Sequence, residues 1–424
     1  MVVGLGAAAC SSTSTASTTT TTGGTSSTTG STSRSIPASA FSDHTGVSSS
    51  AIQIGNVSTL SLGLFKGAQV GTQAYVDYVN STGGVNGRKL VLNNADDSFT
   101  GAGNKQATQN ALQSDLALVG NFSLEDSFGG TVLAANPGFP DVSQILDNAT
   151  NKLPNVYSPI PLADGWASGP MTYYYNKFKA DASHAGAFLA DSPSAAQTWA
   201  GEKYVAEKEG FKFVSEQTYA TTQTDFNQQV IAMKNAGVRI IFMDQMPANY
   251  ASSVFKALAQ QNFHPQVLLG AATYSSQLIP QSGAANVNGA YLSQNLALYL
   301  GTDQTAVPAV ATFLHWVQVA SPGFNPDLFT SYGWLSADLF VQGLKNAGSN
   351  PSRGSLLQAL SKVTSFNGNG FNAPSDPATK TPPNCYLIAT VTNGQFVRSP
   401  DNPPTSGSTG GFRCDGSYIV KPGT

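Results

Sequence analysis

The stretch YVNSTGGVNGRKLVL, residues 78–92, decides the fold of this chain. Apolar and small residues from Ala68 to Val79 lead into it at the spacing of one helix face, and that spacing stops at Gly83. Glycine tolerates the left-handed backbone that closes a helix, so Gly83 is predicted to cap a helix and residues 84–87 to form a turn. The run RKLVL then starts a strand, and a buried strand, AIQIGNVSTL, precedes the helix. The stretch therefore predicts a βαβ unit with parallel strands.

The same alternation of strand and helix continues through most of the chain. The apolar runs LALVG and FPDVS come before residue 150, and HAGAFLAD, FKFVSEQTY, VRIIFMD and QVLLG come after residue 180. Segments with helical spacing separate these runs, as parallel sheets covered by helices require. The strands are too many for one small sheet. The pattern predicts an α/β fold of two doubly wound parallel-sheet lobes joined by a hinge.

Composition indicates a globular chain that works outside the cytoplasm. Hydrophobic residues make up 41% of the 424 residues, which suffices for a large core. Only 11% of the residues are charged, so solubility rests on Ser, Thr, Asn, Gln and Gly, which suits an exported surface. The net charge is −3 and the 21 Lys and Arg residues form no basic run, which argues against nucleic acid as a partner.

The N-terminal segment differs in composition from the rest. MVVGLGAAAC, residues 1–10, resembles the end of a truncated bacterial lipoprotein signal, in which Cys10 would be lipidated after cleavage. It lacks a positive n-region and has Ala7 where such signals usually have Leu, so an ordinary tail with an unmodified cysteine is the alternative. Residues 11–45, rich in Ser, Thr and Gly, are predicted to be a flexible tether. No later run reaches the ~18 apolar residues of a transmembrane helix.

The two remaining cysteines, Cys385 and Cys414, are predicted to form a disulfide. In an exported chain this pairing is the simplest, and closing such a loop contributes on the order of 3 kcal/mol to stability. Two buried free thiols are the alternative. No CxxC motif or Cys/His cluster indicates a metal, and no cofactor is expected.

An enzyme is the weaker interpretation of this sequence. It has no HExxH, GxSxG or Walker A motif, and no GxGxxG opens a helix. The adjacent carboxylates Asp96 and Asp97 would point to opposite faces of a strand, so they are not expected to share a proton. The four histidines are scattered without a neighbouring nucleophile: His44, His184, His264 and His315. An exported hydrolase remains the least favoured alternative.

Several ordered motifs resemble one known family. The segments IQIGNVSTL, FKGAQVGTQAYVDYVNSTGGVNGRKLVLNNADD, TDFNQQVIAMKNAGVRIIFM, HPQVLLGAATYSSQLIP and SYGWLSADLFVQGLKNAG occur in this order. They resemble the type I periplasmic binding proteins, in the branch of the leucine/isoleucine/valine-binding proteins of ABC importers. The resemblance covers about residues 46–365. It implies a monomeric, lipid-anchored extracytoplasmic receptor that closes on a small polar or amphipathic ligand and delivers it to ABC permease subunits. A ligand sensor of the same fold, signalling to a membrane partner, is the alternative.

The resemblance also implies a domain layout in which the chain returns to the first lobe. The first lobe is expected to comprise residues 46–160 and 295–350. The second lobe is expected to comprise residues 161–294 and 351–424. The ligand would then lie in the cleft between the lobes, near the carboxyl ends of the strands.

The resemblance places ligand contacts in four loops that follow strands. The expected contact residues are Asn121, Phe122, Ser123, Ser143, Gln144, Ser192, Ser194, Gln245 and Asn249. Each has a structural alternative: Ser123 in SLED matches a helix capping box, and Ser192 to Ser194 can be an ordinary loop beside Pro193.

Two departures from the amino-acid receptors bear on the ligand. Glu125 and Asp126 would occupy the positive N-terminal end of a helix that otherwise suits a ligand carboxylate. Gln245 and Asn249 stand where relatives often place an acid for the α-ammonium group, although Asp244 could substitute. The sequence therefore predicts a neutral or weakly anionic ligand, such as an amide or a small amphipathic compound, with Phe122 as an apolar wall.

Overall fold

Two parallel-stranded sheets, each packed against helices, carry the architecture. The computed structural model describes residues 35–63, 65–161, 165–191, 193–220, 222–243 and 245–421, apart from the side chains of Leu62, Pro193, Ser194 and Gln197. Among these residues the first sheet has five parallel strands in the order β2-β1-β3-β4-β5. They are β1 (Ala51–Ser58), β2 (Lys89–Asp96), β3 (Ala117–Val119), β4 (Asp141–Val142) and β5 (Val156–Tyr157).

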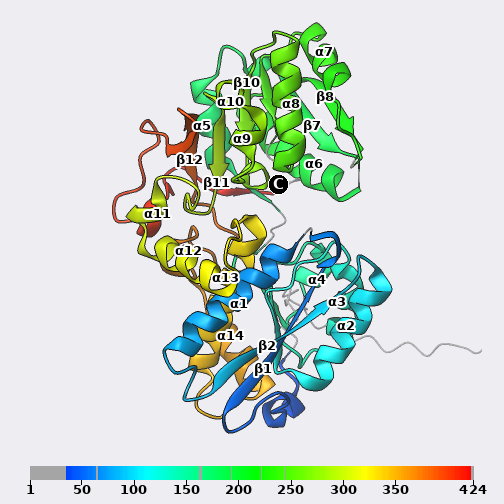
Figure 1. Ribbon diagram of the computed structural model, residues 1–424, viewed down its shortest axis with the longest axis vertical. Helices are drawn as coiled ribbons and strands as arrows, with labels where there is room; N and C mark the ends of the chain where they lie inside the picture. Colours follow the sequence, from blue (N-terminus) through cyan, green and yellow to red (C-terminus); the bar gives the residue numbers. More distant parts are fainter. Residues whose placement is uncertain are drawn as a thin grey trace, which may run out of the picture. The chain divides into compact units, whose positions relative to one another are not determined.

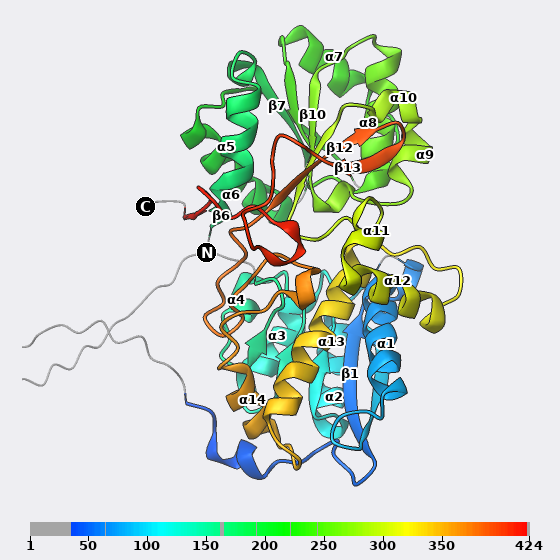
Figure 2. The same cartoon turned by 90° about the vertical axis from the view of Figure 1, so that its left-hand side faces the viewer.

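The second sheet has seven described strands in the order β13-β12-β11-β10-β9-β7-β8. Five are parallel: β7 (Ala185–Ala190), β8 (Phe213–Tyr219), β9 (Ile240–Phe242), β10 (Gln266–Leu269) and β11 (Tyr291–Gln294). The edge hairpin β12 (Leu387–Thr392) and β13 (Gln395–Arg398) is antiparallel. A short pair of β6 (Trp166–Ala167) and β14 (Ile419–Val420) fastens the C-terminal segment beside α6 (Figure 2).

The helices divide between the two sheets (Figure 1). Around the first sheet lie α1 (Lys66–Ser81), α2 (Gly101–Ser114), α3 (Asp126–Ala135), α4 (Asn148–Asn151), α13 (Leu328–Asn346) and α14 (Arg353–Leu360). Around the second lie α5 (Ser168–Lys177), α6 (Pro193–Glu209), α7 (Asn227–Asn235), α8 (Ala248–Gln260), α9 (Leu278–Ser282) and α10 (Ala284–Val287). Helices α11 (Asp303–Ala306) and α12 (Pro308–Ala320) follow β11. Short 3-10 turns occupy Ala38–Ser42, Ser61–Gly63, Ala182–His184, Ala271–Thr273, Gly368–Gly370 and Thr409–Gly411.

The α/β fold predicted from the sequence is confirmed, and the opening stretch forms the expected βαβ unit. Helix α1 ends at Ser81, Gly83 and Gly84 have φ of 103° and 79°, and β2 begins at Lys89. Glycine is required at residue 84 for two reasons. Its φ of 79° lies in the left-handed region, and a Cβ there would lie 1.9 Å from the backbone oxygen of Arg88.

The long helix α13 packs on α1 beside the first sheet. The two helices approach closely because each has a glycine facing the other. A Cβ on Gly71 of α1 would lie 1.9 Å from the backbone oxygen of Thr330. A Cβ on Gly333 of α13 would lie 2.0 Å from the backbone oxygen of Ala68. The Tyr75 hydroxyl donates a hydrogen bond to Asp338 at 2.7 Å across the same interface. The two helices therefore form one layer over the first sheet.

Helix α14 differs from the expected layout, which assigned residues 351–424 to the second lobe. Arg353 at its start is only 5% exposed, and its guanidinium donates to Asp43 Oδ2 at 2.9 Å and to the backbone oxygens of Leu112 and Asp115, both at 2.6 Å. These partners all lie on the side of the first sheet. That sheet with its helices is called the first half below, and the second sheet with its helices is called the second half. A capping box at Ser352 begins α14 directly after α13, so the helix folds back onto α13 before the chain leaves for β12.

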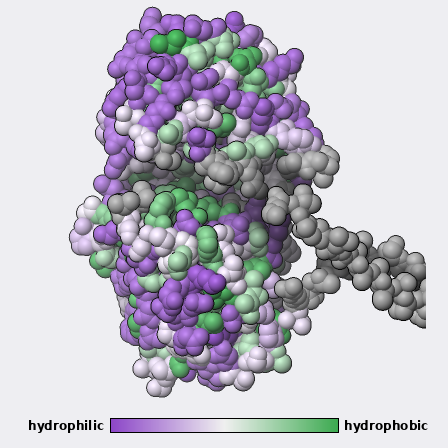
Figure 3. Space-filling view, turned by 90° about the vertical axis from the view of Figure 1, so that its right-hand side faces the viewer, coloured by the Kyte–Doolittle hydropathy of each residue, from purple (hydrophilic) through white to green (hydrophobic). Residues whose placement is uncertain are grey.

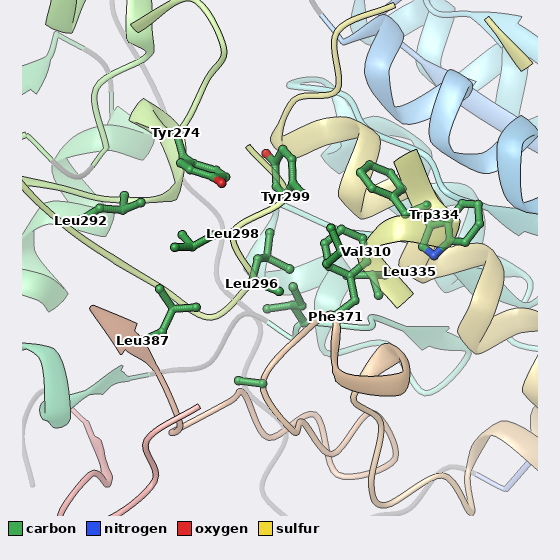
Figure 4. Close-up of a cluster of buried hydrophobic side chains, with 14 of the residues drawn as sticks. Tyr274, Leu292, Leu296, Leu298, Tyr299, Val310, Trp334, Leu335, Phe371 and Leu387 are labelled. Carbon is green, nitrogen blue, oxygen red and sulfur yellow. The ribbon is translucent and has the colours of Figure 1, made fainter. Parts of the chain in front are cut away.

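A continuous hydrophobic core follows the chain as it passes from β11 back toward the first sheet (Figure 4). Leu296, Leu298 and Tyr299 of this crossing are fully buried. The ring of Tyr299 lies 4.9 Å from that of Tyr274, on the side of the second sheet, and 6.0 Å from that of Phe371. The crossing is thus part of the core rather than an exposed linker.

The predicted disulfide is present, because Cys385 and Cys414 are bonded. It ties the start of the β12–β13 hairpin to the C-terminal segment. The hairpin itself was not predicted, although its turn, Asn393-Gly394, carries a sequence signal for two-residue hairpins: both residues have positive φ, of 51° and 74°.

Candidate ligand-binding site

A pocket of about 290 Å³ lies at the carboxyl ends of strands in the second sheet. Strands β8 and β9 flank β7 on opposite sides, so the winding reverses there, and α/β sheets bind small molecules at such switch points. Leu146, which follows β4 of the first sheet, contributes to the wall. The described lining residues are Leu146, Phe188, Leu189, Ala190, Ala195, Thr198, Trp199, Glu202, Phe242 and Gln245. Residues of both sheets therefore meet around one cavity.

The polar feature of this pocket is a carboxylate joined to an amide. Glu202 on α6 is 1% exposed, and its Oε2 accepts a hydrogen bond of 2.7 Å from Nε2 of Gln245, in the turn after β9. An ionised carboxylate only accepts hydrogen bonds, so the amide must present its NH₂ group to Glu202. The hydrogen bond between Glu202 and Gln245 therefore links α6 to the turn after β9.

Aromatic side chains form rigid walls around this pair. The indole N–H of Trp199 donates to Glu216 Oε2 at 2.8 Å, and its ring packs edge-on against Phe213 at 5.0 Å and Phe242 at 6.1 Å. Lys203 donates to the other oxygen of Glu216 at 2.5 Å. Because the polar atom of Trp199 is engaged away from the cavity, its ring offers an apolar surface to a ligand.

Asp126 fixes the loop that brings Leu146 to the pocket. Its Oδ2 accepts the backbone N–H groups of Leu146 at 2.5 Å and Asp147 at 3.1 Å. Burial and, to a smaller extent, the charge of Asp147 raise the pKa of Asp126 to about 6 despite these two bonds. Asp126, which was expected to occupy the positive N-terminal end of a helix, therefore also fixes the loop after β4.

Asn121 and Ser143, both predicted as ligand contacts, are buried and bonded within the first half. Asn121 Oδ1 accepts the N–H of Val57 at 2.8 Å, and its Nδ2 donates to Asp141 at 3.3 Å. Ser143 Oγ accepts the N–H of Asn121 at 3.0 Å and donates to Asp141 at 2.5 Å. Their polar atoms thus join the ends of β1, β3 and β4, the switch point of the first sheet.

Ser123 and Gln144 have comparable roles. Ser123 Oγ accepts the N–H of Glu125 at 2.9 Å and donates to Asp97, so it orders the turn before α3, and the capping box named as its structural alternative does not form. Gln144 Oε1 accepts a hydrogen bond of 2.9 Å from Ser158. Both line a polar cavity of about 20 Å³ together with Asn121 and Asp141, room for a single water molecule. Their role as ligand contacts stays a prediction.

Phe122 lies in an aromatic cluster of the first half. Its ring lies 4.9 Å from Phe65, 4.7 Å from Phe329 and 5.8 Å from Tyr332. It lines the small polar cavity, and it is not among the described residues around the 290 Å³ pocket. Its role as an apolar wall for the ligand stays a prediction.

The remaining predicted site residues divide into three groups. Gln245 lines the pocket, and its role as a ligand contact stays a prediction. Asn249 is an exposed residue in the first turn of α8, where its backbone oxygen accepts a hydrogen bond from Ser253. Ser192, the side chain of Ser194 and Cys10 lie outside the described residues.

Four residues that line the candidate pocket were not predicted from the sequence: Glu202, Trp199, Phe188 and Leu146. The prediction considered only turns that follow strands, whereas Glu202 and Trp199 lie inside α6, one helical face turned toward the cavity. A Trp and a Glu three residues apart, in the middle of the helix after the FLAD strand, were the available signal.

The described part of the chain has neither a helix suited to a bilayer nor a cluster of metal-binding side chains. None of its helices combines the length and apolarity needed to span a bilayer. No group of three or more His, Cys, Asp and Glu residues within it could hold a metal ion.

Comparison with known proteins places the chain in a family. Residues 51–395 match the family model described as periplasmic binding protein. The Leu/Ile/Val-binding protein homolog 1 of Brucella suis is 25% identical over 291 residues, 67% of this chain and 75% of that protein. Its counterpart in Brucella abortus is 26% identical over the same shares.

Solved structures share the fold at low sequence identity. The branched-chain amino acid transporter substrate-binding protein LivJ from Streptococcus pneumoniae, in complex with isoleucine, has a TM-score of 0.66 at 18% identity, covering 88% of this chain and 100% of that chain. A fatty acid ABC transporter substrate-binding protein from Thermomonospora curvata has a TM-score of 0.66 at 18% identity, covering 89% and 93%. With the family match and the shared fold together, the chain belongs to the periplasmic binding proteins, as a type I member of the Leu/Ile/Val-binding kind.

Proposed function

We propose that this protein is the extracytoplasmic receptor of an ABC importer, and that it closes on a small amphipathic ligand held in the pocket around Glu202 and Gln245. The observation that carries the proposal is the position of that pocket. It lies at the switch point of the second sheet, and Leu146 of the first half completes its wall. A ligand there would contact both halves at once, so its binding energy would favour their closed arrangement.

A thermal-shift screen tests ligand binding. Amides, amines, amino acids, short acids and aromatic compounds form the panel, because a ligand at 100 times its Kd raises the free energy of unfolding by ~2.7 kcal/mol. Stabilisation by at least one class is expected, and it should disappear when Trp199 is replaced by Ala. If no compound class stabilises the protein, the receptor proposal loses its support.

Closure is tested separately by small-angle X-ray scattering. With a ligand from the screen, the radius of gyration should fall relative to the ligand-free protein, since hinge closure brings the halves together. An unchanged radius at saturating ligand would contradict closure while leaving binding intact. Uptake of the labelled ligand by cells with and without this chain then tests delivery to permease subunits.

The flexible tether expected over residues 11–45 is contradicted at its end, because Ala38–Ser42 form a 3-10 turn and Asp43 and His44 bond Arg353 and Pro351. The proposed anchor is a lipid on Cys10, with a tether that ends before residue 35 and a monomeric body beyond it. Fractionation of the exported protein tests this, because a lipidated chain partitions into detergent and a Cys10→Ser variant should not. Equal partitioning of both forms into the aqueous phase would contradict lipidation.

The sequence-based prediction of a neutral or weakly anionic ligand, rather than a zwitterionic amino acid, belongs to the same proposal. Calorimetric titration with leucine, isoleucine and valine tests it. Low-micromolar binding of any of the three would show that prediction to be wrong.

A further inference from the structure

A second pocket lies in the first half, apart from the one around Glu202 and Gln245. It has a volume of about 560 Å³, within the range of roughly 300–1,000 Å³ that is usual for small-molecule sites. Its walls come from α1, α12, α13 and the segment after α14, and none of its described lining residues lines the other pocket. It is therefore a separate candidate site.

A carboxylate stands in the wall of this second pocket. Asp338 on α13 accepts a hydrogen bond of 2.7 Å from the hydroxyl of Tyr75 through Oδ1. In the described part of the chain, Tyr75 is the only hydrogen-bond partner of the Asp338 side chain. Asp338 is partly exposed and lines the pocket, so Oδ2 can accept a further bond from a ligand. Burial raises the pKa of this carboxyl, so a cation placed against it would stabilise the ionised form.

Three aromatic rings line the pocket beside this carboxylate. The ring of Tyr75 lies 4.8 Å from that of Trp334 and 5.7 Å from that of Tyr78, edge-on in both cases. The rings of Tyr78 and Trp334 are nearly parallel, with centroids 6.0 Å apart. The face of an aromatic ring attracts a cation within about 6 Å, and more strongly where water is excluded. The carboxylate and the rings therefore favour the same kind of ligand, an organic cation.

The indole of Trp334 adds a hydrogen-bond donor to the pocket. The side chain is only 4% exposed, yet its N–H has no hydrogen-bond partner among the described residues. The nitrogen is not sealed inside the core, so it opens onto the pocket that Trp334 lines. A buried indole N–H usually finds an acceptor. Trp334 and Asp338 are four residues apart on α13, where side chains adjoin, so one ligand can contact both.

Lys345 limits the charge that this pocket accepts. It is the only other charged side chain among the described lining residues. Seven residues separate it from Asp338, about 10 Å along a helix, so it does not neutralise that carboxylate by direct contact. A single positive charge fits beside Asp338, whereas a second one placed toward Lys345 would be repelled.

We propose that this second pocket binds a small organic monocation, an amine that carries a hydroxyl group close to its nitrogen. The ammonium group would donate to Asp338 and lie against the rings of Tyr75 and Tyr78. The hydroxyl oxygen would accept the N–H of Trp334. The site does not depend on the proposed receptor function, because the two pockets share no described lining residue.

Four compounds with the same phenyl body separate these contributions by calorimetric titration at neutral pH. 2-Amino-1-phenylethanol carries the amine and the hydroxyl, 2-phenylethylamine the amine alone, 2-phenylethanol the hydroxyl alone, and 3-phenylpropanoate a carboxylate. The two amines should bind at least about tenfold more tightly than 2-phenylethanol, a ratio within the range measured for hydrogen bonds to charged groups. The amino alcohol should bind more tightly than 2-phenylethylamine, and 3-phenylpropanoate should bind most weakly.

The variant Asp338→Asn keeps the size of the side chain and an acceptor for Tyr75, and it removes the charge. It should weaken both amines by about tenfold or more and leave 2-phenylethanol within a few-fold. Near-ultraviolet circular dichroism and the melting temperature check that the variant is folded. Should it fail to fold, Tyr78→Leu provides the second test, because it removes one ring, should weaken the amines several-fold, and leaves the bond between Tyr75 and Asp338 intact. The same titrations in Trp199→Ala, in the other pocket, should give unchanged amine affinities.

The sign of the charge effect is tested with Lys345→Gln. Removing a positive charge about 10 Å from the bound ammonium should strengthen amine binding by about twofold at low salt and leave 2-phenylethanol unchanged. Lys105→Gln, an exposed lysine on α2, is the matched control and should change neither. Helix α2 lies on the right of Figure 1, the side whose surface Figure 3 shows, whereas α12 and α13 lie to the left.

The outcomes separate this site from the receptor proposal. Binding of 2-phenylethanol as tight as that of the amines, or unchanged amine affinity in Asp338→Asn, overturns the inference. Equal affinities of the two amines overturn the role given to Trp334. Loss of amine binding in Trp199→Ala places the amine in the other pocket and overturns the inference as well. None of these results removes the receptor proposal, which fails only if no compound class binds around Glu202 and Gln245.

Discussion

Arg398 and Asp303 lie 95 residues apart in the sequence and face each other in a paired ionic contact, with Nε to Oδ1 at 2.8 Å and Nη2 to Oδ2 at 2.7 Å. Arg398 ends β13, and Asp303 begins α11. The carboxylate also accepts the backbone N–H of Leu298 at 2.7 Å. The pair therefore fixes the crossing after β11 to the edge hairpin of the second sheet.

Replacing Arg398 by Ala should destabilise the protein by about 3 kcal/mol, because the nearly buried carboxylate of Asp303 would lose its cationic partner. Equilibrium unfolding in urea measures this. Arg413→Ala is the matched control, since the hydrogen bond described for the Arg413 side chain is a long one of 3.3 Å to the backbone oxygen of Pro403. Equal effects of the two substitutions would contradict a structural role for the pair.

Gly71→Ala should destabilise the protein by several kcal/mol, although alanine is the better helix former by about 1 kcal/mol. The added methyl group would lie 1.9 Å from the backbone oxygen of Thr330, so α1 and α13 would have to separate. Thermal unfolding monitored by circular dichroism checks the sign. Ser81→Ala, at the exposed end of the same helix, is the control. A rise in melting temperature for Gly71→Ala would refute the close packing of the two helices.

Removing the disulfide should lower the free energy of unfolding by about 3–4 kcal/mol, the loop entropy expected for a sequence separation of 29 residues. The double variant Cys385→Ser and Cys414→Ser tests this by urea unfolding under non-reducing conditions. Wild-type protein in reductant should approach the stability of the variant. Alkylation of both thiols in exported, unreduced protein would show that the bond does not form.

The free energy of unfolding should decrease as the pH rises, because of the buried carboxyl of Asp141. Burial and the nearby charge of Asp126 raise its pKa to about 7, although hydrogen bonds from Ser143 and Asn121 and the charge of Lys380 lower it. Between its ordinary pKa of 3.8 and about 7, the folded protein holds a proton that the unfolded chain has released, so this contribution is lost as pH rises.

The test compares wild type with Asp141→Asn at pH values from 4 to 8. The stability of the wild type relative to the variant should fall across this window, with the exposed carboxyl in Asp415→Asn as control. A difference that stays constant, or that grows in favour of wild type with pH, would contradict a raised pKa for Asp141.

Local sequence patterns predicted the fold because the signals that specify it are local. Helical spacing up to Val79 and glycines with positive φ at residues 83 and 84 suffice to end α1 and begin β2. The Asn393-Gly394 turn was an equally local signal, and it was overlooked rather than absent. Arg353, in contrast, gave no local sign of its partners, since Asp43 and Leu112 are distant in the sequence.

The candidate site was predicted less well, for a physical reason. Strand ends indicate which loops lie near a switch point, and Gln245 was found in this way. They do not indicate whether a polar side chain faces the cavity or a backbone group inside the fold. Asn121 bonds the N–H of Val57, a partner that only the tertiary structure reveals. Glu202 reaches the pocket from within a helix, and the orientation of that helix is also set by tertiary packing.

The attachment of the N-terminal segment determines which part of the protein would bear a pulling force applied to that segment. Asp43 bonds Arg353 at 2.9 Å, and the ring of His44 bonds the backbone oxygen of Pro351 at 2.9 Å, so residues 43 and 44 are clamped to the turn before α14. A pull from anything upstream of residue 35 would therefore be borne by the first half alone. In a tethered receptor, the first half would stay stationary, and the second half, which carries Glu202 and Gln245, would swing to capture or release its cargo.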